Sequence, residues 1–215
     1  MFQIPLEFGS QIVDLCSALL LVTSFAIVAQ RRLSACVDLY ALQSFFLATT
    51  AAVVALLTGT SHLYLAAGLN IAIKVLIIPR ILKRIVERLQ VKREVELIVG
   101  IPPSLLACGA LVIFSFYLSQ PILSMGPLLT RDSLAIGLAI LLIGCFTMVS
   151  RQQAVTQVVG FLVIENGLFL VATAAVYGMP LIIELGIFFD VLVAAIVIGI
   201  FVHRIQETFE QVKAP

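Results

Sequence analysis

The sequence predicts an all-α integral membrane protein of about seven transmembrane helices, with its N-terminus outside and its C-terminus inside. Hydrophobic residues make up 61% of the 215 positions and charged residues only 12%, and the mean hydropathy is +1.16. Soluble domains contain about 45–50% apolar residues, so lipid is the expected solvent. Seven apolar stretches of about 20 residues have the length that a bilayer-spanning helix needs, because unpaired backbone groups are too costly in hydrocarbon.

The first apolar stretch is expected to remain in the protein. Residues 1–10 contain no Lys or Arg and so lack the basic region of a cleaved signal peptide. The connections between the stretches are short, which favours antiparallel packing of neighbours along the chain. We predict helices at residues 9–29, 36–58, 62–82, 97–118, 131–149, 154–176 and 181–203.

The third stretch runs into the longest polar break of the chain, residues 80–96. Apolar side chains recur through this break at helical spacing, at Leu82, Ile85, Val86 and Leu89, with basic residues between them. This pattern predicts a basic amphipathic extension of the third helix, lying at the inner membrane interface.

Proline marks two helices near the inner membrane surface. Pro79, beside Arg80, is expected to bend or end the third helix, because proline has no N–H and its ring clashes with the preceding turn. Pro102 and Pro103 are expected to kink the fourth helix near its inner start.

The distribution of basic residues predicts the orientation of the helices. With the N-terminus outside, only Arg131 of the 13 Lys and Arg residues falls in an outside loop, and Lys74 lies within a helix. Such a bias indicates N-outside, C-inside by the positive-inside rule. The inside residues are Arg31, Arg32, Arg80, Lys83, Arg84, Arg88, Lys92, Arg93, Arg151, Arg204 and Lys213.

The same pattern suggests three parts of the chain. Residues 1–96 would form an N-terminal three-helix unit that includes the amphipathic segment 80–96, residues 97–130 a connecting helix, and residues 131–215 a second three-helix unit. Both units start outside and end inside, which leaves open a diverged internal repeat or a coincidence of short helices.

Ionisable groups within the apolar stretches are the main candidates for function. Charged side chains are costly in a bilayer and persist mainly where they face a protein interior or a hydrated path. At about 1.5 Å rise per residue, Lys74, Glu165 and Asp190 fall near mid-bilayer, with Glu184 nearer the outside. Desolvation penalises the charged forms of acids and amines, so such groups can exchange protons near neutral pH. We therefore predict a proton path through these four residues.

Three amides accompany these charges. Asn166 follows Glu165, Gln43 lies in the second helix, and Asn70 lies one turn before Lys74 on the same face. The alternative interpretation is structural: an interhelical ion pair of Lys74 with Glu165 or Asp190, which would move no proton.

No catalytic, metal or cofactor site is predicted in this chain. The four cysteines lie far apart with no C-x-x-C pair, which favours packing roles over a disulfide framework, zinc or an iron–sulfur cluster. His62 and His203 lie on opposite membrane sides and cannot share a haem. Glu184 and Asp190 are about 240° apart round a helix and cannot clamp one metal. Motifs of phosphate loops, metalloproteases and hydrolases do not occur in the sequence, and no nucleic-acid partner is expected.

Nine glycines within or beside the apolar stretches are expected to be points of close approach between helices, since the lack of a side chain lets backbones come together. They are Gly59, Gly68, Gly100, Gly109, Gly137, Gly144, Gly160, Gly167 and Gly186.

The sequence I-E-N-G at residues 164–167 is the most specific of several segments that together resemble component E of hydrogenase-4 and formate hydrogenlyase type membrane complexes. Length and helix count agree with that family. The resemblance spans nearly the whole chain. Its segments are residues 32–34, 40, 43–44, 74–76, 78–79, 151–153, 160–167 and 184–190.

The last three helices are in turn similar to the K subunit of complex I and the C subunit of multisubunit cation/proton antiporters. In the K subunit, a glutamate in each of the second and third helices belongs to the proton path of the membrane centre. Glu165 matches the first of these within V-I-E-N, and Asp190 matches the second by its distance from Arg204. Asp190 departs from the family's glutamate, so Glu184 is an alternative counterpart.

The resemblance implies a membrane-arm subunit in a bacterial inner membrane. Its partners would be large antiporter-like subunits and, through them, a nickel–iron hydrogenase or related hydrophilic arm that holds the catalytic metals. A purely structural spacer between antiporter-like subunits and a stand-alone permease are the competing hypotheses. The transported ion, proton or sodium, stays open.

Overall fold

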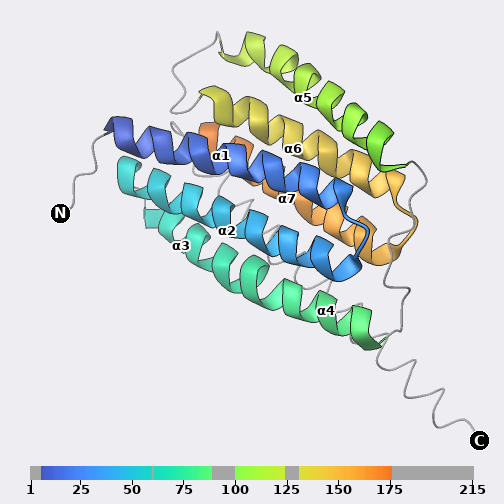
Figure 1. Ribbon diagram of the computed structural model, residues 1–215. Helices are drawn as coiled ribbons and strands as arrows, with labels where there is room; N and C mark the ends of the chain where they lie inside the picture. The colour runs from blue at the N-terminus through green and yellow to red at the C-terminus, as the bar shows by residue number, and fades with distance from the viewer. Residues whose placement is uncertain (1–5, 60, 89–99, 124–130, 176–215) are drawn as a thin grey trace, which may run out of the picture.

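A computed structural model describes residues 6–59, 61–88, 100–123 and 131–175, and Figure 1 shows their arrangement. The ordered elements within these ranges are helices. They are α1 (Leu6–Ala29), α2 (Leu33–Thr58), α3 (Ser61–Asn70), the π-helix η1 (Ile71–Ile77), α4 (Ile78–Arg88), α5 (Ile101–Leu123), α6 (Arg131–Ser150) and α7 (Ala154–Ala175).

Six helical spans in the described part of the chain are long and apolar enough to cross a membrane. Helices α1, α2, α5, α6 and α7 each form one span, and α3, η1 and α4 together form another. The six helices predicted between residues 9 and 176 are thereby confirmed, with ends shifted by a few residues. The seventh predicted helix, residues 181–203, lies outside the described residues.

Four helices form the centre of the bundle. Helix α1 packs on α2 and α6, and α7 packs on α2 and α6 behind α1 (Figure 1). The span α3–η1–α4 flanks this centre along α2, while α5 flanks it along α6. Helix α5 keeps much of its apolar surface exposed, including Ile113 and Tyr117, as expected of a helix that faces lipid. The centre is therefore where polar side chains from distant parts of the sequence can meet.

The third span does not end at Pro79. Within η1 the backbone widens, and the Ile78 N–H bonds Ile73 O, five residues back. A wide turn just before proline relieves the clash that its ring would make with the α-helical carbonyl four residues earlier. The helix continues to Arg88, so it does not end at Pro79, and a bend there stays a prediction.

The amphipathic extension is confirmed for residues 78–88. Ile78 and Leu82 are buried, whereas Arg80 and Arg84 are exposed. The remainder of the predicted segment, residues 89–96, lies outside the described residues.

The prediction of a proline kink in the fourth helix is also wrong. Helix α5 begins at Ile101, so Pro102 and Pro103 stand in its first turn. The first N–H groups of a helix have no partner within it, and proline is tolerated there without a kink.

Helices α6 and α7 approach each other backbone to backbone through four of the predicted glycines. A Cβ added to Gly144 would lie 2.7 Å from Ile164 N and 2.9 Å from Gly160 O. One added to Gly167 would lie 2.6 Å from Leu141 N and 2.8 Å from Gly137 O. The close-packing prediction therefore holds for this pair of helices.

The other described glycines have different roles. Among the described residues, a Cβ at Gly68 or Gly109 would meet nothing within 4 Å, and one at Gly100 would reach only nearby proline side chains. Gly59 ends α2 in the left-handed conformation, with φ 70° and its N–H donating to Ala55 O at 2.9 Å. These four make no close approach to another described helix. Gly186 lies outside the described residues.

Candidate functional site

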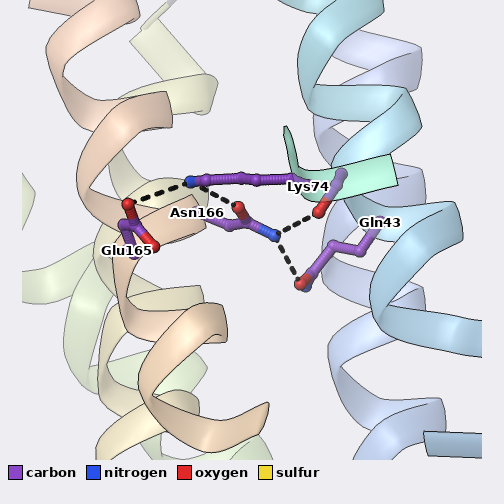
Figure 2. Close-up of polar contacts among 5 residues, drawn as sticks. Gln43, Lys74, Glu165 and Asn166 are labelled. Atoms are coloured by element: carbon purple, nitrogen blue, oxygen red, sulfur yellow. Dashed lines mark hydrogen bonds and ion pairs between the residues drawn. The ribbon is translucent and has the colours of Figure 1, made fainter. Parts of the chain in front are cut away.

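Two charged side chains meet in the middle of the helix bundle. Lys74 projects from η1 and Glu165 from α7, and Lys74 Nζ lies 3.4 Å from Glu165 Oε1 (Figure 2). Their side chains are 0% and 6% exposed. Removing two charges from water is costly, and their attraction offsets that cost only when further hydrogen bonds satisfy them.

Asn166 supplies one of these hydrogen bonds and connects the pair to α2. Lys74 Nζ donates to Asn166 Oδ1 at 3.1 Å. Asn166 Nδ2 in turn donates to Gln43 Oε1 at 3.1 Å and to Ser44 Oγ at 3.2 Å (Figure 2). Both amides are completely buried.

The contacts continue from α2 to α1. Gln43 Nε2 donates to Ser24 Oγ at 2.6 Å and to the backbone oxygen of Leu20 at 3.2 Å. Ser24 Oγ donates to the same carbonyl at 3.0 Å. We refer to Ser24, Gln43, Ser44, Lys74, Glu165 and Asn166 as the buried polar network. It joins α1, α2, η1 and α7 at one level of the bundle.

Helical spacing explains why these side chains point inward. On α2, Tyr40, Gln43 and Leu47 are all fully buried, three or four residues apart. The same spacing buries Leu162 and Asn166 on α7. Residues at this spacing share one helix face. Gln43 and Asn166 thus occupy polar positions on faces that are otherwise apolar.

The structure brings together Gln43, Lys74, Glu165 and Asn166 from the set predicted by sequence. Asn70, at the end of α3, is completely buried, but its amide makes no hydrogen bond with any residue that the structure describes. Asp190 and Glu184 lie outside the described residues, and their roles stay predictions.

Comparison with known proteins identifies the family. The chain is 35% identical over 205 residues to the uncharacterized protein Rv0085 of Mycobacterium tuberculosis, covering 93% of this chain and 91% of that protein. It is 25% identical over 202 residues to hydrogenase-4 component E of Escherichia coli K12 and of Shigella flexneri, covering 93% of each chain. No protein-family profile matches the chain, and no solved structure is significantly similar to it.

This chain belongs to one family with Rv0085 and is homologous to hydrogenase-4 component E. The resemblance expected from the I-E-N-G segment and its companions is thereby confirmed over nearly the full length. Together with the six apolar spans, homology to component E makes this a multi-pass membrane protein. The similarity of its last three helices to the K subunit stays a prediction.

Sequence reasoning missed two hydroxyls of the site in this component E relative. Ser24 accepts from Gln43, and Ser44 accepts from Asn166. Serine is common on packing faces of membrane helices, so its presence in α1 or α2 does not by itself predict a buried polar network. The position of Ser44 directly after Gln43 is the one local signal available.

Arg151 was also missed, because a basic residue between two apolar stretches is expected to lie in a solvated loop. It is 3% exposed in the turn between α6 and α7, and its Nη2 donates to Val28 O near the end of α1. Burial lowers the pKa of the Arg151 guanidinium from its ordinary value. Arginine nevertheless stays charged in proteins, and the partial negative charge of the α1 C-terminus stabilises it.

The described part of this component E relative thus holds one buried contact between an amine and a carboxylate, Lys74 Nζ with Glu165 Oε1. Within residues 6–59, 61–88, 100–123 and 131–175, no group of three or more His, Cys, Asp or Glu side chains could hold a metal ion.

Proposed function

We propose that this chain is a membrane-arm subunit of a hydrogenase-4-like redox complex and that its Lys74–Glu165 pair takes part in moving protons through that arm. The observation that carries the proposal is the contact of Lys74 Nζ with Glu165 Oε1, 3.4 Å apart and buried in a bundle of apolar helices. Intramembrane ionisable residues face the protein interior or a hydrated cavity and mark ion pathways and proton relays.

Family membership supports the first part of this proposal. Relatives named hydrogenase-4 component E match 93% of the chain, so the whole bundle corresponds to that component. The partners proposed here are large antiporter-like membrane subunits and, beyond them, a nickel–iron hydrogenase or related hydrophilic arm. The proposed setting is a bacterial inner membrane, with the N-terminus outside and the C-terminus inside.

Two features of the pair support the second part. Neither charged side chain is solvated, so the energies of the ionised and neutral forms of each depend on the neighbouring charge. Each residue also comes from a different span, η1 and α7, so a proton that passes between them moves laterally in the membrane rather than along one helix.

A structural role is the alternative. The amides of Asn166 and Gln43 form hydrogen bonds at every donor, which suits a fixed cross-link between helices as well as a relay. In that case the chain would bridge larger membrane subunits and move no proton.

The deciding experiment measures protons transferred per turnover by the intact complex in sealed vesicles, in sodium-free buffer. Glu165→Gln keeps the size and hydrogen bonding of the side chain but removes its titrating proton, so the complex should assemble and lose coupled transfer. Glu87→Gln makes the same chemical change at an exposed position of α4 and should leave transfer unchanged. Wild-type transfer by Glu165→Gln would overturn the relay and leave the structural bridge.

A further inference from the structure

Hydrogen bonds in the buried polar network run in a single direction. Lys74 donates to Asn166, Asn166 donates to Gln43, and Gln43 donates to the Leu20 carbonyl and to Ser24. Ser24 then donates to that same carbonyl. In these five bonds each donor points away from Lys74, and the series ends on a backbone oxygen of α1.

Both amides use all of their donors. A carboxamide has two N–H donors and one acceptor oxygen. Asn166 gives its donors to Gln43 and Ser44, and its oxygen accepts from Lys74. Gln43 gives its donors to Ser24 and the Leu20 carbonyl, and its oxygen accepts from Asn166. Rotating either amide would break several buried contacts at once, so the network fixes both orientations.

The series of hydrogen bonds from Asn166 through Gln43 to α1, called the arm below, is unsuited to carrying protons. Carboxamides are absent from the groups that titrate in the pH range of proteins, and the arm ends on a carbonyl that has no proton to pass on. What the arm can do is hold the Asn166 oxygen in place as an acceptor for Lys74.

We propose that Gln43 is a positioning residue for Lys74, acting through Asn166, and that the arm from Asn166 to α1 holds the ammonium beside Glu165 without conducting protons. This inference rests on the proposed function, since it concerns how the same pair is held. It separates the network into a titrating part, Lys74 and Glu165, and a non-titrating support, Asn166, Gln43 and Ser24.

The proposal has a measurable consequence for pH dependence. An oxygen that accepts a hydrogen bond from an ammonium group stabilises its charged form. When Gln43 is removed, Asn166 loses the contact that orients it, and Lys74 loses this acceptor. The charged form of Lys74 then loses this stabilisation, so the decline of proton transfer at high pH, the alkaline limb of the profile, should move to lower pH.

The test uses the intact complex in vesicles and records protons per turnover across a pH series. Gln43→Met is unbranched and of similar length, so it removes the amide with little change in packing. The matched control is Thr50→Val, because Thr50 is also buried in α2 but its hydroxyl donates to Phe46 O of its own helix. Glu165→Gln is measured alongside.

The expected result is partial transfer by Gln43→Met with the alkaline limb moved to lower pH, no displacement by Thr50→Val, and no transfer by Glu165→Gln. A Gln43→Met profile identical to the wild type, with Glu165→Gln inactive, would refute the positioning role and leave the proposed function intact. Loss of transfer at every pH in Gln43→Met would also refute it, since that is the behaviour of a conducting residue. Normal transfer by Glu165→Gln would remove the proposed function itself.

Ser24→Ala provides a second test if the complex that carries Gln43→Met does not assemble. It removes one of the two acceptors of Gln43 and leaves the Leu20 carbonyl. The alkaline limb should move in the same direction by a smaller amount, and an unchanged profile would count against the proposal.

Discussion

Helix α7 has two interfaces that are built from different groups. Toward α6 it presents Gly160 and Gly167, and the two backbones approach so closely that a Cβ has no room. Toward α2 and η1 it presents Asn166 and Glu165, which contact Gln43 and Lys74 through polar side chains. One face depends on close approach at glycines, and the other on polar side chains.

The two interfaces of α7 are stabilised in lipid by different interactions. Lipid tails are as apolar as leucine, so burial alone gives helices little reason to associate. The α6–α7 contact relies on van der Waals packing between closely fitting helices, which does not depend on pH. The contact with η1 relies on charges and hydrogen bonds, so its free energy depends on which protons are bound.

The largest effect is expected from breaking the charged interface on one side only. Lys74→Met removes the Lys74 ammonium from the buried Glu165 carboxylate, and breaking a buried pair on one side should lower stability by about 3–5 kcal/mol. Lys74→Met combined with Glu165→Gln removes both charges and should recover most of that loss. Thermal unfolding of the purified complex in detergent measures both; a double variant as unstable as the sum of the single ones would contradict the pairing.

The shape-based interface should respond to a single methyl group. Gly144→Ala places a Cβ against backbone atoms of α7, and overpacking of this kind costs about 1–3 kcal/mol. Gly109→Ala, in the middle of α5 with no described atom within 4 Å of the added Cβ, should be neutral or stabilising by up to about 1 kcal/mol, because alanine favours a helix. Equal unfolding temperatures for the two variants would show that α6 and α7 can separate without cost.

The smallest effect is expected where a charged pair meets water. Lys83 on α4 pairs with Asp38 on α2, but their side chains are 41% and 60% exposed. Exposed pairs contribute about 0.2–1 kcal/mol, so Lys83→Gln should barely change the unfolding temperature, and less still at high salt. A loss comparable to that of Lys74→Met would mean that burial does not distinguish the two pairs.

The spans, and the meeting of Lys74 and Glu165 at one level of them, could be predicted from sequence because both follow from counting along a helix. Residue counts alone placed Lys74 and Glu165 near mid-bilayer, and the structure has them in contact. Which glycines pack closely could not be predicted, since Gly144 and Gly109 look alike until their neighbours are known. The burial of Arg151 escaped for the same reason: its partner, the Val28 carbonyl, is 123 residues away in the chain.

The wide turn of η1 also determines which side of the third span faces the bundle along its length. Its buried positions Asn70, Lys74, Ile78 and Leu82 recur every four residues, whereas an α-helix repeats every 3.6. In a regular α-helix each step of four would overshoot by about 40°, and the last position would drift roughly 120° from the first. The π-helical hydrogen bonding takes up this surplus. A single-residue deletion between residues 71 and 77 would therefore keep the span long enough for a membrane but rotate the basic helix α4 relative to Asn70.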